Sequence, residues 1–145
     1  MGELSMSVEE REAFLTDLHV GMIGIERAEG PPLTVPVWYG YEPGGEVWVL
    51  TDGESLKGRL LERARRFSLC AQTETVPYSY VSVEGTATIR PSDVEADSRP
   101  MARRYLGDER GDWYTENVPH GARPIRVSMT PERWFTVDYS KMGGG

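Results

Sequence analysis

The 145-residue sequence predicts a mainly β fold of the α+β kind, an antiparallel barrel of about six strands with two or three peripheral helices. Apolar and polar residues alternate in several short runs, most clearly in SYVSVEGTATIR (79–90). Turn residues such as those in EPGGE (42–46) join consecutive runs, which is typical of hairpins and not of strand–helix–strand units. No internal repeat or linker is evident, so residues 1–145 are interpreted as one domain, with 1–6 and 141–145 expected to be flexible.

The first half of the chain supplies one helix and a hairpin. Ser7 and Glu10 match a capping box ahead of an apolar face, which predicts a helix over about residues 7–18. The β-branched run HVGMIGIER (19–27) predicts a strand, and PPLTVPVWYGYEPGGEVWVLT (31–51) predicts a hairpin. Pro36 lacks an amide hydrogen, so its strand is expected at a sheet edge or locally interrupted.

A second helix is expected from about residue 55, because Leu56, Leu60, Leu61 and Ala64 recur at helical spacing. FSLCAQTE (67–74) and residues 79–90 predict the next two strands. In the second of these, the apolar face is Val81, Val83, Gly85, Ala87 and Ile89.

The last third is predicted to hold a helix, a loop and the final strands. Ser92 and Glu95 match a second capping box for a helix to about Leu106, in which Pro100 is a candidate kink. Residues 107–124 are expected to form a long irregular segment, and loops of that length are often functional. IRVSMTPERWFTVDY (125–139) predicts a final strand or pair of strands.

The charge, apolar runs, cysteine and histidines of the sequence exclude several classes of function. The 16 Lys and Arg residues against 23 Asp and Glu give a net charge of −7, so nucleic acid is not expected as a partner. No apolar run approaches the ~20 residues that cross a bilayer, and the acidic start does not resemble a signal peptide. A single cysteine, Cys70, rules out an intramolecular disulfide and fits a cytoplasmic protein. His19 and His120 are far apart in sequence, so a zinc site is not expected.

The stretch TDGESLKGRLLERARR (51–66) places Lys57 and Arg59 in the first turn of the predicted helix, where the unpaired amides already carry partial positive charge. One interpretation is that a phosphate lies between these cations and the amides. Thr51 and Ser55 would supply hydroxyl donors to it, and Gly53 and Gly58 would let the backbone come close. The other interpretation is that both cations are solvated surface charges, which costs only tenths of a kcal/mol. Spacing alone does not decide between them.

No GxxxxGK[ST] or GxGxxG motif and no Ser–His–Asp or Cys–His arrangement is present. The segments LTVPVWYGYEPGGEVWVLTDGESLKGRLL, FSLCAQTETVPYSYVSVEGTATI and RVSMTPERWFTVDY, in this order, resemble the split β-barrel flavoprotein family named after pyridoxamine 5′-phosphate oxidase. More narrowly, they resemble its small actinobacterial branch that uses the deazaflavin F420. The resemblance spans about residues 8–140. It implies a six-stranded split β-barrel homodimer with two flavin-type cofactors at the subunit interface.

The resemblance also implies positions for the cofactor. Its phosphate would be bound by Thr51, Ser55, Lys57 and Arg59. Its ring would pack against Val35, Pro36, Val37 and Trp38, with Gln72 near the ring or ribityl part and Tyr78 and Tyr80 supplied by the partner subunit. Without the resemblance, an aromatic residue such as Trp38 is more simply explained by core or interface packing.

The implied function is an F420H2-dependent oxidoreductase that transfers hydride to a planar conjugated acceptor of the quinone, tetrapyrrole or enone type. The basic residues that hold pyridoxamine phosphate in the vitamin-forming oxidases cannot be placed here, so vitamin B6 oxidation is not expected. No catalytic side chain is evident, which leaves the chemistry to the cofactor. The alternatives are an FMN-dependent oxidoreductase and a flavin- or haem-binding protein without turnover. A basic groove for the acidic oligoglutamate tail of F420 could be formed by Arg59, Arg63 and Arg66. The other interpretation is that these arginines are a solvated helix face.

Overall fold

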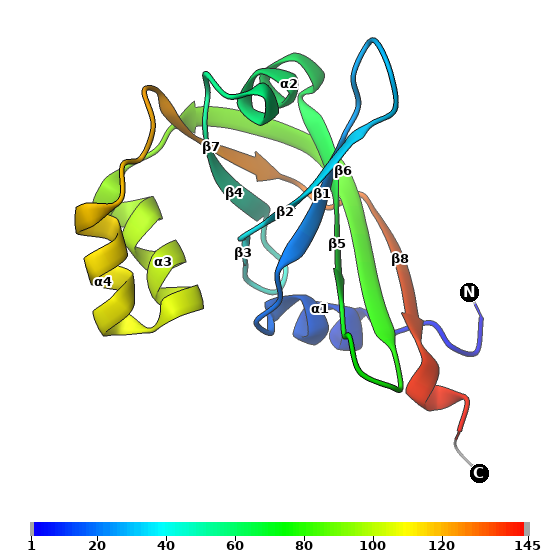
Figure 1. Ribbon diagram of the computed structural model, residues 1–145. Coiled ribbons are helices and arrows are strands. Elements are labelled where there is room, and N and C mark those ends of the chain that lie inside the picture. The colour runs from blue at the N-terminus through cyan, green and yellow to red at the C-terminus, as the bar shows by residue number, and fades with distance from the viewer. Residues whose placement is uncertain (1, 144–145) are drawn as a thin grey trace.

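The computed structural model describes residues 2–143. Within them, the eight strands form one curled antiparallel sheet in the order β2-β1-β5-β6-β7-β4-β3, and β8 pairs with β6 (Figure 1). The strands are β1 (Gly21–Ile25), β2 (Leu33–Val37), β3 (Gly40–Tyr41), β4 (Val47–Asp52), β5 (Arg66–Gln72), β6 (Ser79–Pro91), β7 (Pro124–Met129) and β8 (Arg133–Asp138). The helices are α1 (Val8–Thr16), α2 (Leu56–Ala64), α3 (Arg99–Leu106) and α4 (Asp108–Asn117), with a π-helical turn at Val94–Ser98 and a 3-10 turn at Tyr139–Lys141.

The long strand β6 curls the sheet because its two halves have different partners. Its first half lies between β5 and β8, where Val83 is opposite Leu69 and Trp134. Its second half pairs with β7, where Ile89 is opposite Val127. The predicted alternation is confirmed, since the inward side chains of β6 join one buried cluster with those of β1, β4, β5 and β7. The core therefore lies on the concave side of the sheet.

The predicted hairpin over residues 31–51 forms only in part. Tyr41 pairs with Val47 across the turn, but β2 leaves this hairpin and pairs with β1, where Pro36 is opposite Met22. Pro36 is therefore in an edge strand, as its missing amide hydrogen predicts. The two predicted arms lie at opposite ends of the sheet order, and the short segment between β2 and β3 joins those ends.

The first two helices begin where the sequence predicts. Ser7 Oγ accepts a hydrogen bond from the Glu10 amide, and Glu10 accepts one from the Ser7 amide, which completes the capping box. Ser55 caps α2, whose buried residues are Gly58, Leu60 and Leu61. None of the helices in residues 2–143 has the length and apolar character to span a membrane. Of the ends expected to be flexible, residues 1, 144 and 145 lie outside the described part of the chain.

Two predictions for the last third are wrong. The cap after β6 is Asp93, whose carboxylate accepts from the Ala96 amide, whereas Glu95 pairs with Arg99. The segment 107–124 is not an irregular loop, because it contains α4, which packs along α3 (Figure 1). The contact depends on Gly111, where an added Cβ would lie 2.7 Å from the Arg103 Cα. A helix held by a close backbone approach lacks the apolar stripe that sequence patterns detect.

Candidate functional site

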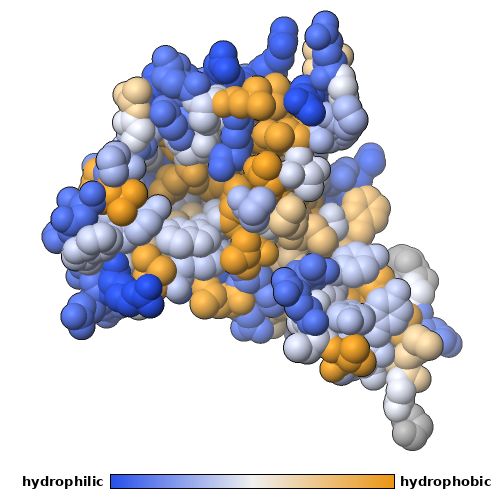
Figure 2. Space-filling model, viewed as in Figure 1, coloured by the Kyte–Doolittle hydropathy of each residue, from blue (hydrophilic) through white to orange (hydrophobic). Residues whose placement is uncertain are grey.

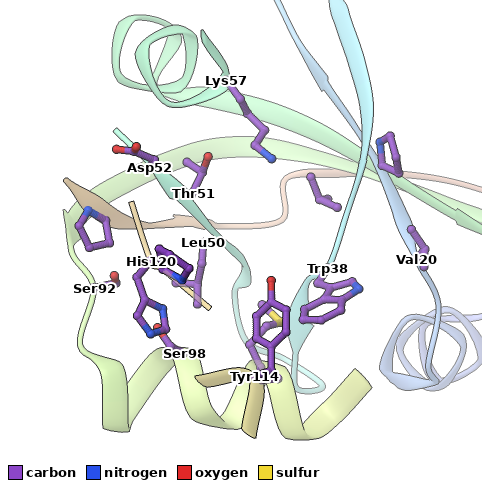
Figure 3. Close-up of a pocket in the computed structure, with 16 residues that line it drawn as sticks. Val20, Trp38, Leu50, Thr51, Asp52, Lys57, Ser92, Ser98, Tyr114 and His120 are labelled. Carbon is purple, nitrogen blue, oxygen red and sulfur yellow. The ribbon is translucent and has the colours of Figure 1, made fainter. Parts of the chain in front are cut away.

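A cavity of about 470 Å3 lies between the sheet edge and the α3–α4 pair (Figure 3). Its size falls in the range typical of small-molecule sites. The walls come from the ends of β2 and β4, the start of α2, and the segment from Ser92 to Pro124. The lining residues are Val20, Pro36, Val37, Trp38, Leu50, Thr51, Asp52, Lys57, Ser92, Ser98, Met101, Ala102, Tyr114, Pro119, His120 and Pro124.

Lys57 gives one end of the cavity a positive charge. Its side chain is half-buried and points from α2 into the cavity (Figure 3). Burial lowers the pKa of the Lys57 ammonium, because the charged form loses hydration. Within residues 2–143, the ammonium has no hydrogen-bond or ion-pair partner. A desolvated cation without a protein partner favours the binding of an anion beside it.

The first turn of α2 leaves two backbone donors next to Lys57. Ser55 Oγ already accepts from the Gly58 amide at 3.0 Å and donates to the Asp52 carbonyl at 2.6 Å. No hydrogen bond to the Leu56 or Lys57 amide occurs in the described part of the chain. The helix start therefore offers amides as well as a cation to an anion, whereas the Ser55 hydroxyl is occupied by capping.

The two glycines in this region are required by close packing within the fold. An added Cβ at Gly58 would lie 2.2 Å from the Asp52 carbonyl oxygen. At Gly53 it would lie 2.5 Å from the guanidinium carbon of Arg123. Close packing within the fold therefore accounts for both glycines, and the approach of the backbone to a phosphate at these positions stays a prediction.

Aromatic rings form the opposite side of the cavity. The Trp38 ring stacks on Tyr105, with centroids 4.9 Å apart and an interplanar angle of 5°, and Tyr114 lies tilted at 5.4 Å. The Tyr105 hydroxyl donates to the His19 carbonyl at 2.6 Å, and it also accepts from the Tyr39 amide. These bonds fix the orientation of Tyr105, so Trp38 presents a flat, supported surface next to the cavity. Tyr114 Oη and Lys57 Nζ point toward the cavity from opposite sides (Figure 3).

A buried carboxylate anchors the α3–α4 side. Asp97 is only 1% exposed and pairs with Arg90 at 2.8 Å and Arg126 at 3.0 Å, while the Asp93 amide donates to it. Burial alone would raise the pKa of Asp97, but these hydrogen bonds lower it to about 2. Arg126 also lies over the Trp48 ring, 4.1 Å from its centroid. The carboxylate thus connects the turn before α3 with β6 and β7.

The segment after α4 closes the last side. Asp52 at the end of β4 accepts hydrogen bonds from the amides of Glu54, Arg123 and Ala122, and these bonds lower its pKa. Arg123 pairs with Glu62 on α2. His120 lines the cavity, and its Nε2 lies 2.8 Å from the Thr115 carbonyl at the end of α4. Since a carbonyl can only accept, this nitrogen carries a proton.

The structure brings five of the predicted site residues to the cavity wall: Pro36, Val37, Trp38, Thr51 and Lys57. The other six do not line it. Ser55 caps α2, Arg59 is exposed on the same helix, and Val35 packs against the core. Gln72 and Tyr80 are opposite one another on β5 and β6, and Tyr78 is exposed just before β6.

The residues that sequence reasoning missed come mainly from the segment interpreted as a loop. Tyr114 and His120 line the cavity because α4 and the turn after it fold back toward β4. Met101 and Ala102 belong to the buried side of α3. Besides metal binding, a histidine just after a helix end, such as His120, is typical of a carbonyl cap, and that signal requires α4 to be recognised first. In residues 2–143, no cluster of His, Cys, Asp and Glu suited to a metal ion is present.

The curled antiparallel sheet with a cavity at its edge defines an α+β domain with a candidate small-molecule site. The chain belongs to the pyridoxamine 5′-phosphate oxidase family, whose model matches residues 7–138. No curated protein matches the chain at a significant level.

Solved structures show the same fold. A conserved hypothetical protein of Mycobacterium tuberculosis is 23% identical with a TM-score of 0.80, and the alignment covers 100% of this chain and 92% of that one. An F420 reductase is 18% identical with a TM-score of 0.69, covering 86% and 94%. An FAD-binding protein of Mesorhizobium loti is 18% identical with a TM-score of 0.66, covering 91% and 93%. A haem-binding protein also has this fold, so the fold alone does not select a cofactor.

Proposed function

We propose that this protein is an F420H2-dependent oxidoreductase that transfers a hydride to a planar conjugated acceptor. The observation that carries the proposal is the unpartnered, half-buried Lys57 ammonium, which faces the supported Trp38 surface across one cavity. A cofactor with a phosphate and a flat ring matches these two features. The residues present therefore fit a flavin-type cofactor.

In this proposal the bound cofactor supplies the hydride, and the protein holds the reacting partners. Lys57, with the Leu56 and Lys57 amides, binds the phosphate. Pro36, Val37 and Trp38 orient the ring, and the α3–α4 side of the cavity receives the acceptor. Burying both partners brings the reacting atoms together and excludes water.

The choice of F420 over FMN rests on the charge of α2. Arg59 and Arg63 are exposed, lie four residues apart on one face, and have no ion-pair partner in residues 2–143. Arg66 is different, because it pairs with Glu26. Two exposed arginines on the helix that begins at the proposed phosphate site suit the acidic tail that F420 carries and FMN lacks. FMN is the second candidate, because Lys57 suits its phosphate equally well.

The proposal includes a homodimer formed through the convex face of the sheet. The residues Pro36, Met22, Cys70, Ser82 and Phe135 follow one another across β2, β1, β5, β6 and β8 on this face. Phe135 is 52% exposed and Met22 39% exposed. Figure 2 shows hydrophobic side chains gathered in the middle of the view, over β1 and β2. Exposed apolar side chains at both ends of this row, on either side of the half-buried Cys70 and Ser82, favour association with a second copy.

Titration with F420 and FMN side by side tests the proposal. We expect fluorescence quenching of added F420, oxidation of F420H2 by an acceptor, and no activity with NADH or NADPH. At about 1 M salt the Debye length falls to ~3 Å, so F420 binding should weaken more than FMN binding. An Arg59→Ala/Arg63→Ala variant should lose that difference in salt response. If FMN co-purifies stoichiometrically, F420 cannot displace it, and both ligands respond equally to salt, then the FMN alternative replaces F420.

A further inference from the structure

We propose that His120 is the proton donor of the cavity and that its Nδ1 protonates the acceptor after hydride transfer. This inference rests on the proposed function and adds a catalytic residue to it. A carbonyl acceptor that gains a hydride becomes an anion, and a protein that reduces it needs a nearby acid. Histidine is the side chain whose charge ordinarily changes between pH 5 and 8, so it can donate and recover a proton near neutral pH.

The hydrogen bonds of His120 determine which nitrogen is available. Nε2 donates to the Thr115 carbonyl at 2.8 Å, and Thr115 Oγ1 in turn donates to the Gly111 carbonyl at 2.7 Å. This fixes the ring at the end of α4 with Nε2 protonated. Within residues 2–143, Nδ1 has no hydrogen-bond partner, and the His120 side chain lines the cavity. The ring is therefore held by one nitrogen while the other remains free for a ligand.

His19, the second histidine of the chain, provides an internal comparison. Its Nε2 lies 3.1 Å from the carbonyl of Phe14, five residues earlier in the chain. His120 Nε2 has the same relation to the carbonyl of Thr115, which is also five residues earlier. Both rings therefore cap the end of a helix. The His19 ring, however, stacks on Phe14 with centroids 4.5 Å apart and does not line the cavity. Capping explains both histidines equally, whereas exposure to the cavity distinguishes His120.

The other polar groups of the cavity are less suited to this role. The titratable residues on its walls besides His120 are Lys57 on α2, Asp52 at the end of β4 and Tyr114 on α4. Lys57 serves the phosphate in the proposed function, and the Asp52 carboxylate accepts three backbone hydrogen bonds. Tyr114 faces the cavity, but a phenol is a weaker acid than an imidazolium.

The step can be written for 2-cyclohexen-1-one as the probe. The hydride that the reduced cofactor would supply, at the cost of its own two-electron oxidation, forms a C–H bond at C3 of the enone. The C2–C3 π pair becomes the C1–C2 π bond of an enolate, and the carbonyl π pair moves to oxygen. The Nδ1–H bond of the His120 imidazolium breaks and an O–H bond forms, giving an enol that becomes cyclohexanone in water. The neutral imidazole then takes a proton from solvent.

Single-turnover reduction of this enone by the F420H2-loaded protein tests the role, with His120→Gln as the variant and His19→Gln as the matched control. We expect the wild-type rate to fall as pH rises from 5 to 8, and to be slower in deuterated water. His120→Gln should be slower by about 100-fold or more and lose both effects, while its F420 affinity stays within about twofold. His19→Gln should behave as wild type.

NMR of the untagged protein gives a readout that is independent of turnover, because the chain has only two imidazoles. We expect neutral His120 to be the Nε2–H tautomer. When the enone is added to protein loaded with oxidised F420, the signals of His120 should shift and those of His19 should not. Unaltered pH dependence in His120→Gln, an Nδ1–H tautomer, or no response to the enone overturns the role of His120 alone. A wild-type protein that binds neither F420 nor FMN overturns the proposed function, and the role of His120 with it.

Discussion

Replacing Lys57 with alanine should separate ligand binding from folding. A charge-assisted hydrogen bond contributes roughly 1.5–3 kcal/mol, so the loss of the ammonium should weaken a phosphate-bearing cofactor by about ten- to a hundredfold. Folding should respond differently. Because burial lowers the pKa of Lys57 in the folded state, the charged form is less favourable there than in the unfolded chain at neutral pH. The lost charge therefore costs no stability, and the free energy of unfolding should change by less than about 1 kcal/mol.

The assay is fluorescence titration with F420 and with FMN, combined with urea unfolding of the protein without ligand. Arg59→Ala is the matched control, because Arg59 is a cation of the same helix turn that does not line the cavity. In low salt it should reduce F420 affinity by less than Lys57→Ala does, and it should leave FMN affinity unchanged. Equal affinity of wild-type and Lys57→Ala protein for both ligands would refute the phosphate site and return Lys57 to the solvated-charge interpretation.

Three further predictions test the interface and the supports of the cavity. Phe135→Asp on the convex face should convert a dimer into a monomer in analytical ultracentrifugation at micromolar concentration. The control Trp113→Asp, on the exposed side of α4, should leave the dimer intact. A wild-type protein that is itself a monomer would contradict the proposed interface. Asp97→Asn should destabilise the protein by about 3 kcal/mol at pH 7, because it leaves Arg90 and Arg126 without their carboxylate. Hydrogen bonding lowers the pKa of Asp97 from 3.8 to about 2, so the contribution of its carboxylate to stability should be complete above about pH 4 and disappear as pH falls to about 2. Equal acid unfolding of Asp97→Asn and wild-type protein would argue against the network. Tyr39→Phe should cost about 1–3 kcal/mol, because it leaves the buried Leu15 carbonyl without its 2.6 Å donor, and it should leave cofactor affinity unchanged; a large loss of affinity would show that Tyr39 contacts the ligand.

The strands and the first two helices were predictable because their signals are local. The alternation in β6 and the Ser7–Glu10 capping box depend on residues two or three positions apart, and both are present in the structure. The strand partners were less predictable. Nothing local in residues 31–51 shows that β2 pairs with β1, because that choice depends on how the whole sheet curls.

The candidate site was predictable from sequence where its distinctive residues lie together in one short segment. Lys57 stands out because a cation at a helix start is electrostatically unfavourable, and the structure places its ammonium in the cavity. Tyr114 and His120 could not be found in this way. Tyr114 lies on α4, and His120 lies in the turn that follows it. This helix is stabilised by the close approach at Gly111 and by ion pairs of Asp112 with Arg99 and Arg103, which leave no periodic apolar signal.

The two sides of the cavity differ in how firmly they are connected to the fold. Lys57 and Trp38 adjoin the sheet directly, at the start of α2 and the end of β2. The opposite side comes from α3, α4 and the turn that holds His120. These segments reach the sheet through Asp97, through the Arg123 amide, which donates to Asp52 at the end of β4, and through the stacking of Tyr105 on Trp38. Substitutions on α3 and α4 can therefore reshape the proposed acceptor side without moving the proposed phosphate site at Lys57. It follows that variants of Met101 or Tyr114 should change the choice of acceptor while leaving cofactor affinity nearly unchanged, whereas variants of Lys57 should do the reverse.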